Sequence, residues 1–303
     1  MADGMEIEGN KKIYDVESVL SRKNKGSVKW QQMYQWMPDV ADDVVPLTVA
    51  DMEFRTAPEI TKGLQEYLED NILGYSVPTE GYYQAVIDWQ RRRHNFEVEK
   101  EWILTSPGVV SAFYAAVRAY TQPGEGVIIM TPVYYPFFGA IENAGRKVVR
   151  NPLLNRADDY TIDFKGLEHL CRKKENKLII FCSPHNPVGR VWTEEELARL
   201  ADIVLRYDMI IVADEIHHDL IMPGYEHKVF QTLSYAVAER TVTCTSPSKT
   251  FNLAGLCTTN IIIQNEALRK KLSDALGSVA CGMVGTLGLE GCRIAYEGAG
   301  ELL

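Results

Sequence analysis

The sequence predicts an α/β fold in which helices cover both faces of a mainly parallel sheet. From about residue 100 onward, short apolar runs rich in β-branched residues alternate with longer amphipathic stretches, which is the pattern of successive βαβ units. The short runs lean apolar throughout instead of alternating, which indicates strands buried on both faces. With 303 residues, 46% of them hydrophobic, the chain can form one large core and a smaller second domain.

Five runs are the strand candidates. They cover residues 127–130, 178–182, 209–213, 241–244 and 259–263. The clearest helix between them spans residues 193–206, because Thr193 can cap its first turn, Glu196 occupies the capping-box position, and apolar residues recur on one face.

Two further helices are predicted before this core, at residues 58–70 and 81–94. The turn-rich segment 74–78 separates them and is expected to be a surface loop or an interface. The first fifty residues look irregular, and we expect them to form a separate layer packed on the main domain. After Gly277 the composition turns rich in small residues, and the chain ends at Leu303 in what reads as an unfinished helix.

Charge and composition exclude several classes of function. The net charge of −9 disfavours a nucleic-acid partner, which would need clustered Lys and Arg. The acidic start, Met1 to Asn10, lacks the apolar core of a secretory signal, and no apolar run is long enough to cross a bilayer, so we expect a cytoplasmic protein. The six cysteines show neither C-x-x-C spacing nor a zinc-finger histidine, so we expect reduced packing residues and no metal.

The most informative segment, TSPSKTFNLAGL at residues 245–256, directly follows the candidate strand 241–244. Ligands of open α/β sheets gather outside the carboxyl ends of strands, so Lys249, flanked by hydroxyls, is well placed to meet a phosphorylated, carbonyl-bearing cofactor. A lysine by itself is usually a surface charge. Asp214 also emerges from the end of a buried strand, where it could pair with a pyridinium nitrogen or with a structural Arg.

Two more loops follow strand candidates. In SPHNPVG, residues 183–189, Asn186 could bind the phenolic oxygen of such a cofactor, although Asn-Pro is also a common turn. The loop TSPGVV, residues 105–110, leads into a helix, so the amides of Gly108 and Val109 suit a dianionic phosphate.

Together these loops resemble the fold-type I pyridoxal-phosphate enzymes, the aminotransferase class I/II superfamily, from about Val49 onward. The motifs SPHNPVG, ADEIH and SPSKTFNLAGL most resemble its cystathionine β-lyase-like branch. The resemblance implies an aspartate-aminotransferase-like, three-layer large domain over residues 56–290. It also implies a smaller domain formed by residues 1–55 and by residues 291–303, the latter truncated, because family members continue to an Arg that binds the substrate carboxylate.

The resemblance also implies the roles of individual residues. Lys249 binds pyridoxal 5′-phosphate as a Schiff base, Asp214 pairs with its ring nitrogen, and Asn186 contacts its ring oxygen. Tyr134 stacks on the ring. His217 joins the cofactor-binding set at a position where aspartate-type aminotransferases carry Tyr. The phosphate is bound by Ser246, Gly108 and Val109, and by Tyr75 from the neighbouring subunit of a homodimer.

The implied activity is cleavage of cystathionine or a related cysteine conjugate to a thiol, pyruvate and ammonia. Lys249 would act as the general base on a small amino-acid substrate. The same residues would serve an aminotransferase, which is the alternative within the family. A non-catalytic cofactor-binding regulator is the alternative of another class. A nicotinamide oxidoreductase is weaker, because Gly282, Gly285, Gly288 and Gly291 lack the strand–G-x-G-x-x-G–helix context and indicate close helix packing instead.

Overall fold

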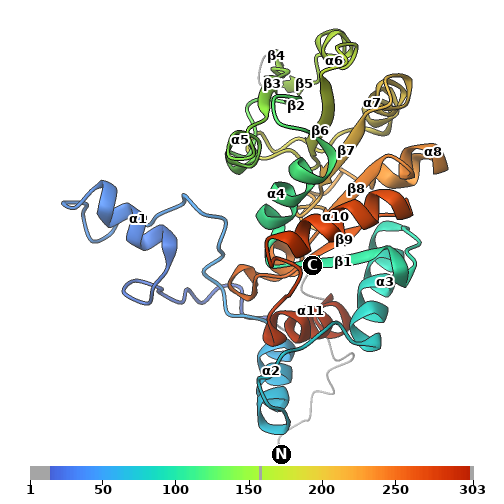
Figure 1. Ribbon diagram of the computed structural model, residues 1–303. Coiled ribbons are helices and arrows are strands. Elements are labelled where there is room, and N and C mark those ends of the chain that lie inside the picture. The colour runs from blue at the N-terminus through green and yellow to red at the C-terminus, as the bar shows by residue number, and fades with distance from the viewer. Residues whose placement is uncertain (1–13, 157–158, 301–303) are drawn as a thin grey trace, which may run out of the picture.

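The centre of the molecule is a seven-stranded sheet in the computed structural model, which describes residues 14–156 and 159–300 (Figure 1). The strand order is β1-β9-β8-β7-β6-β2-β3. The strands are β1 (Ile103–Ser106), β2 (Gly126–Ile129), β3 (Lys147–Arg150), β6 (Asn176–Cys182), β7 (Ile210–Asp214), β8 (Thr241–Thr245) and β9 (Thr259–Ile262). Only β9 runs antiparallel to its neighbours, β1 and β8. The prediction of a mainly parallel sheet is confirmed.

All five predicted strands are present, each with an end displaced by one or two residues. The sheet also contains β1 and β3, which the apolar runs did not reveal. Both are edge strands of only four residues, and β3 is exposed at both ends, so neither needs a continuous apolar run. A separate hairpin of β4 (Leu154–Arg156) and β5 (Asp159–Thr161) lies beyond β3 in the chain.

Helices cover both faces of the sheet, because alternate side chains of one strand point to opposite faces. Leu178 and Ile180 of β6 pack on one side, and Ile179 and Phe181 on the other. The first face is covered by α4 (Val109–Tyr120), α5 (Pro136–Glu142) and α10 (Glu266–Ser278), and the second by α6 (Phe164–Cys171), α7 (Glu194–Arg206) and α8 (Tyr235–Ala238). The predicted three-layer α/β/α arrangement is therefore confirmed.

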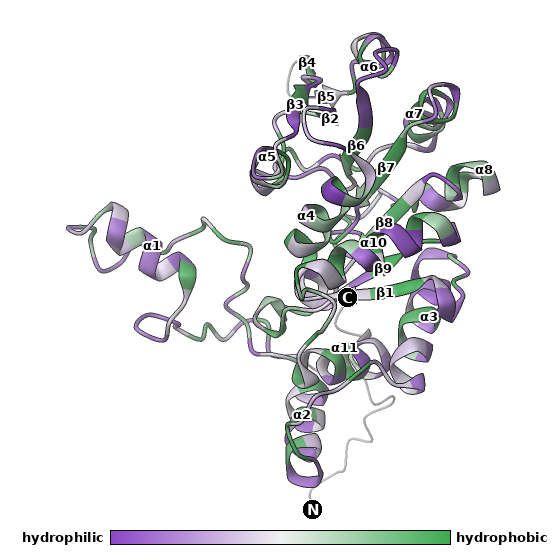
Figure 2. Ribbon diagram, in the orientation of Figure 1, coloured by the Kyte–Doolittle hydropathy of each residue, from purple (hydrophilic) through white to green (hydrophobic). Residues whose placement is uncertain are grey.

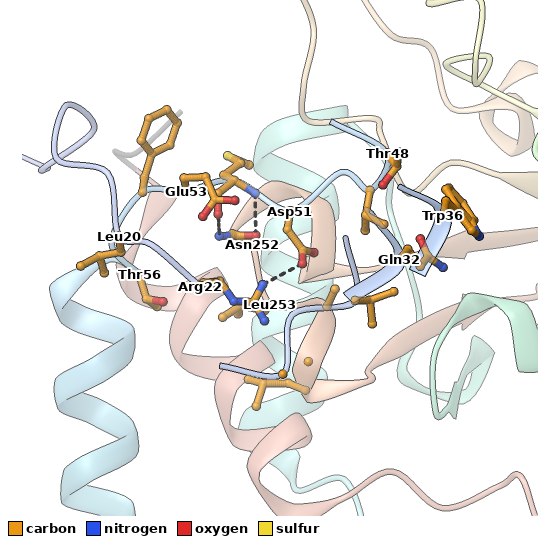
Figure 3. Close-up of a pocket in the computed structure, with 18 of the residues that line it drawn as sticks. Leu20, Arg22, Gln32, Trp36, Thr48, Asp51, Glu53, Thr56, Asn252 and Leu253 are labelled. Atoms are coloured by element: carbon orange, nitrogen blue, oxygen red, sulfur yellow. Dashed lines mark hydrogen bonds and ion pairs between the residues drawn. The ribbon is translucent and has the colours of Figure 1, made fainter. Parts of the chain in front are cut away.

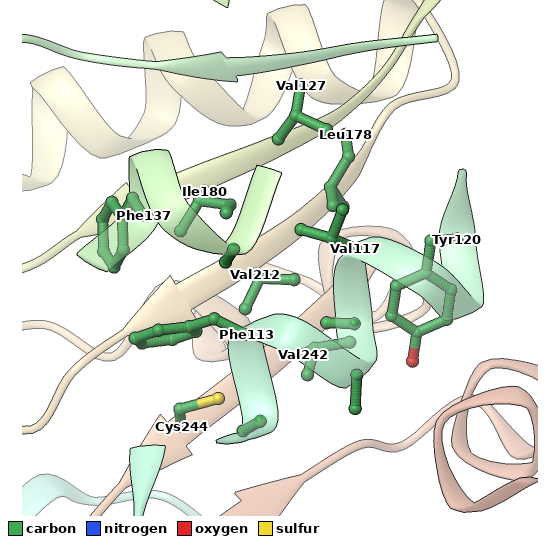
Figure 4. Close-up of a cluster of buried hydrophobic side chains, with 14 of the residues drawn as sticks. Phe113, Val117, Tyr120, Val127, Phe137, Leu178, Ile180, Val212, Val242 and Cys244 are labelled. Atoms are coloured by element: carbon green, nitrogen blue, oxygen red, sulfur yellow. The ribbon is translucent and has the colours of Figure 1, made fainter. Parts of the chain in front are cut away.

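The core beneath α4 gives a scale for the stability of this arrangement. Phe113 is fully buried and lies against Phe137 with the rings edge to face, in one cluster with the strand residues Val212 and Val242 (Figure 4). Truncating a buried Phe to Ala typically costs about 3–5 kcal/mol. Packing of α4 therefore fixes the position of its first turn, which leads out of the loop after β1.

Helix α7 begins as the sequence predicted. The Thr193 hydroxyl accepts a hydrogen bond from the Glu196 amide at 3.2 Å, and the Glu196 carboxylate accepts one from the Thr193 amide at 2.9 Å. Leu197, Leu200 and Val204 form its buried face. The capping box and the apolar face predicted for residues 193–206 are both confirmed.

A further helical cluster lies beside β1. It consists of α2 (Pro58–Asp70), α3 (Glu80–His94) and α11 (Thr286–Gly298), with η1 (Lys100–Trp102) leading into β1. Trp89 of α3 stacks on Tyr296 of α11 at 4.8 Å between ring centroids. The helices predicted at 58–70 and 81–94 are thus confirmed. Helix α11 continues without a break across residue 290, where the smaller domain was expected to resume, and the division into domains stays a prediction.

Two of the four glycines that were expected to allow close helix packing do have a close neighbour. A Cβ on Gly288 would lie 2.5 Å from the backbone carbonyl oxygen of Leu256, in η3 (Ala254–Leu256), so only glycine lets α11 approach that turn there. A Cβ on Gly291 would lie 2.5 Å from the end of the Leu256 side chain, which would have to shift. A Cβ on Gly282 or Gly285 would meet nothing within 4 Å. Close packing was therefore the wrong expectation for these two, which precede the turns of α11 that touch η3.

The N-terminal segment differs from the predicted irregular layer. It contains the helix α1 (Val28–Trp36), and Figure 1 shows this helix projecting from the main body. Lys29 is buried within the segment itself, where it donates to the Asp51 carbonyl at 2.9 Å and pairs with Glu53. The segment therefore folds largely on itself. Its first residues, Met1 to Asn10, lie outside the described part, as do residues 301–303.

The hydropathy of the residues also distinguishes the sheet from the N-terminal segment. Figure 2 shows mostly hydrophobic residues along β1 and β7, whereas α1 and its loops alternate between hydrophilic and hydrophobic. Among the residues that the structure describes, none of the helices combines the length and apolarity that crossing a membrane requires.

Candidate cofactor and active site

Five loops open at the same edge of the sheet, because β1, β2, β6, β7 and β8 run in the same direction. Hydrogen bonds tie neighbouring loops together. The Nε2 atom of His185 lies 2.9 Å from the Pro132 carbonyl, and the Ser183 amide donates to the Asp214 carbonyl at 2.9 Å. The fold therefore collects at one edge the loops that carry Gly108, Tyr134, Asn186, Asp214 and Lys249.

Asp214 is the last residue of β7 and is 2% exposed. Burial raises the pKa of its carboxyl to about 7, although a backbone hydrogen bond from Ile216 and the positive charge of Lys249 act in the opposite direction. Its Oδ1 atom is buried and has no hydrogen-bond partner in the described structure. A buried carboxylate oxygen of this kind calls for a cationic N–H donor.

Lys249 lies in the short helix α9 (Pro247–Thr250), which begins two residues after β8 ends. Its charge acts on two other predicted site residues, Asp214 and His217. Its charge lowers the pKa of Asp214 and, together with a larger effect of burial, lowers the pKa of His217 to about 4. The structure thus brings an amine, a carboxyl and an imidazole near enough at the sheet edge for the lysine charge to act on the other two.

Ser246 caps α9 and is almost fully buried. Its hydroxyl donates to the Thr258 carbonyl at 2.6 Å and accepts from the Ser248 amide at 3.1 Å. Gripping a phosphate would require this hydroxyl to turn away from Thr258, with Ser248 beside it as a second donor.

The loop between β1 and α4 provides the other part of the expected phosphate site. Gly108 has a φ of +81°, which favours glycine, and a Cβ there would meet nothing within 4 Å. Its amide donates to the Ser106 carbonyl at 2.9 Å, and Val109 begins the twelve-residue helix α4. The helix dipole and the open space in front of Gly108 both suit an anion.

Tyr134 lies on the loop after β2, and Asn186 lies on the loop after β6. Tyr134 is half-buried, edge-on to Phe137 at 5.9 Å between centroids, and burial followed by the charge of Asp214 raises the pKa of its phenol. Asn186 is also half-buried and, with His217, lines a pocket of about 490 Å³. Both side chains thus border the same edge as Asp214.

Tyr75 does not join this group within the chain. It lies in the loop between α2 and α3 and is 98% exposed. Its predicted contact with the phosphate of a neighbouring subunit stays a prediction.

A second, larger pocket of about 1040 Å³ lies over the end of the lysine motif, and residues 49 and 51–54 form part of its lining (Figure 3). Asn252 connects two segments that line this pocket, since its side chain accepts a hydrogen bond from the Met52 amide at 3.1 Å and donates one to the Met52 carbonyl at 2.9 Å. Arg22, which also lines the pocket, pairs with Asp51 at 2.7 Å. The position of Asn252 in the lysine motif did not reveal a partner 200 residues away.

A sheet of this order, with an acid ending β7 and a lysine just after β8, defines the fold-type I class of pyridoxal-phosphate enzymes. The chain belongs to the aminotransferase class I and II family, whose model matches residues 42–283.

Several members of this family resemble the chain over most of its length. Cystathionine beta-lyase PatB of Bacillus subtilis is 40% identical over 277 residues, which are 91% of this chain and 71% of that protein. The crystal structure of cystalysin from Treponema denticola, which contains a pyridoxal 5′-phosphate cofactor, has a TM-score of 0.94 and 49% identity, covering 96% of this chain and 74% of that one. The PLP-bound C-S lyase from Staphylococcus hominis has a TM-score of 0.88 and 32% identity, covering 97% and 73%.

Proposed function

We propose that this protein is a pyridoxal-5′-phosphate-dependent C–S β-lyase that cleaves cystathionine or a related cysteine conjugate to a thiol, pyruvate and ammonia. The observation that carries the proposal is the buried, unpartnered Oδ1 of Asp214, close enough to Lys249 for their charges to interact. The relatives named as cystathionine beta-lyase and C-S lyase support this branch of the family.

The residues at the sheet edge fit the cofactor in charge and in shape. A protonated pyridine nitrogen would give Asp214 the donor that its Oδ1 lacks and would keep the carboxyl ionised. The Asn186 amide would donate to the ring oxygen, and Tyr134 would cover one face of the ring. Its phosphate would lie in front of Gly108 at the N-terminus of α4.

Three further residues complete the proposed cofactor site. Val109 would supply a first-turn amide of α4, and Ser246 a hydroxyl from the start of α9. His217 would stay neutral beside Lys249, because burial and the lysine charge lower its pKa to about 4. A neutral imidazole can accept a hydrogen bond without adding a second positive charge to the site.

The bound cofactor supplies an electron sink for the bond electrons of the substrate. Lys249 would hold it through Nζ. Once the substrate amine is bound in its place, the free amine of Lys249 would accept the α-proton as general base. Asp214 keeps its negative charge throughout, and Tyr134 keeps its proton because burial raises its pKa. Departure of the thiolate from the substrate Cβ gives the lyase outcome.

We further propose that the working form is a homodimer. Tyr75, 98% exposed in its own chain, would reach the phosphate of the neighbouring subunit.

Residues 1–55 and the chain after residue 290 are proposed to belong to a smaller domain. The cytoplasm is the proposed compartment.

The test is a coupled pyruvate assay with L-cystathionine, run on the protein and on Lys249→Ala together with absorbance spectra. Pyruvate release and a lysine-bound cofactor band that Lys249→Ala abolishes are the expected results. Conversion of the cofactor to its amine form without pyruvate would establish the aminotransferase instead. A cofactor band with no turnover of any amino acid would indicate the non-catalytic regulator.

A further inference from the structure

A buried cluster of histidines and carboxylates lies behind the turn that follows Asp214. His94 comes from the end of α3, and His218 and Asp219 from the turn after β7. Glu215 and His227 lie beside them. The five side chains are at most 5% exposed. None of them has a role in the proposed lyase chemistry.

Hydrogen bonding leaves one member of this cluster unsatisfied. The His94 Nε2 atom lies 2.8 Å from Asp219 Oδ1. The His218 Nε2 atom lies 3.2 Å from Asp219 Oδ2, yet neither ring nitrogen of this buried residue has a hydrogen-bond partner in the described structure. The rings of His94 and His218 are only 4.0 Å apart between centroids. The Nε2 atom is thus held only by an ion pair without good hydrogen-bond geometry, and the buried Nδ1 atom has no partner among the described residues, which is costly and points to a missing partner.

Charge points to the same conclusion. The side chains of Asp219 and Glu215 are 0% exposed, so two negative charges are buried together. Their ion-pair partners among the described residues are the three histidines alone. A divalent cation would balance the two carboxylates while the imidazoles stay neutral, the form in which histidine binds metals.

We propose that His94, His218 and Asp219 form a binding site for a divalent transition metal of the zinc class. Their ligand atoms lie within 4.8 Å of one another. Metal–nitrogen bonds of about 2.0–2.1 Å in a tetrahedral site place ligands roughly 3.3 Å apart, close to the spacing found between the two rings and Asp219. A water molecule or His227 would complete the coordination.

The surroundings favour this triad over the neighbouring one of Glu215, His218 and His227. Both oxygens of Glu215 already have partners, the Phe230 amide at 3.0 Å and His227 at 2.9 Å. Asp219 likewise keeps Oδ1 toward a histidine, His94, but its Oδ2 accepts from two outer donors, a hydroxyl and an indole. These donors are Thr250 at 2.7 Å and Trp89 at 3.3 Å. Such outer hydrogen bonds typically fix the orientation of a carboxylate ligand.

The site would join three elements that are distant in sequence. It would link α3 to the turn after β7, and through Thr250 it would reach α9, one residue beyond Lys249. Its existence does not depend on the reaction that the enzyme catalyses.

The test uses tag-free holoenzyme stripped of metal with a chelator and then titrated with Zn²⁺ or Co²⁺ alone. We expect about one Zn²⁺ per chain by elemental analysis after gel filtration, and visible d–d bands of a low-symmetry Co²⁺ complex. At a hundredfold excess over Kd, Zn²⁺ should raise Tm by about 4 °C. No retained Zn²⁺ and no such bands would overturn the proposal and leave a metal-free hydrogen-bond network.

Variants separate this site from adventitious binding. His94→Gln and His218→Ala should each lose the metal, whereas His169→Ala, a change in an exposed histidine on α6, should keep it. Lys249→Ala should also keep it, which excludes an ion held by the cofactor. Retention of one ion by both His94→Gln and His218→Ala would refute the assignment. Circular dichroism of each variant checks its folding, and the Co²⁺ spectrum of the unaltered protein stands even if a variant unfolds.

Discussion

Replacing Asp214 by Asn should stabilise the cofactor-free protein while weakening the enzyme. The carboxyl is buried, and its pKa is raised from 3.8 to about 7, chiefly by burial. Between these two pH values the folded protein keeps a proton that the unfolded chain has released. Stability therefore falls as pH rises through this window and levels off above about pH 7. Asn has nearly the same shape and no charge, so it removes this dependence.

The size of the effect follows from the pKa. One pKa unit corresponds to about 1.36 kcal/mol, so the rise from 3.8 to about 7 amounts to about 4 kcal/mol of lost stability at pH 8. The buried amide that replaces the carboxyl lacks a partner too, which takes back about 1–3 kcal/mol. We expect Asp214→Asn without cofactor to be about 2 kcal/mol more stable than the parent at pH 8.

The activity should change in the opposite direction. With cofactor bound, the amide can no longer stabilise a protonated ring nitrogen, and a charge-assisted hydrogen bond worth about 3 kcal/mol is lost. That loss corresponds to a decrease in kcat of roughly 100-fold.

Urea unfolding of the cofactor-free proteins between pH 4.5 and pH 8, with pyruvate assays of the reconstituted ones, measures both effects. Asp202→Asn, a change on the exposed face of α7, is the matched control and should alter neither. A variant at Asp214 that is less stable than the parent at pH 8, or one that keeps the parental loss of stability between pH 4.5 and pH 7, would refute the reasoning.

Three other predictions concern contacts outside the cofactor pair. Asn252→Gly keeps the positive φ of +57° but loses both hydrogen bonds to Met52. Proteolysis before residue 52 should therefore accelerate about tenfold and KM should rise, and an unchanged rate of cleavage would contradict this. Tyr75→Phe should weaken cofactor affinity about fivefold in spectral titrations, and an active monomer by light scattering would argue against its role across subunits. Thr193→Ala removes the capping box with Glu196 and should lower Tm by about 2 °C in calorimetry, whereas an unaltered Tm would mean that the cap adds nothing.

Much of the fold could be predicted from local patterns in the sequence. The five buried strands and the helices α2, α3 and α7 followed from apolar runs, periodicity and capping residues, which act within a few positions of the chain. The loop motifs led to the family to which the chain belongs. Edge strands β1 and β3 and the helix α1 were missed, because short or weakly amphipathic segments carry little periodic signal.

The candidate site divides in the same way. Lys249, Asp214 and Asn186 could be named because each follows a strand in a recognisable motif, and parallel strands end at one edge. The pKa shifts of these residues could not be predicted from the sequence, because the raised pKa of Asp214 results from burial by other elements of the fold.

The sequence by itself determined the layers, the strand ends and the loops at which a cofactor would bind, since these depend on neighbouring residues. Only the tertiary structure decided which distant residues meet. It reversed β9 against β1 and β8, placed Asn252 on Met52, and brought His94 to Asp219 across 125 positions. Such contacts depend on the order in which strands join a sheet, which local patterns of hydrophobicity do not encode.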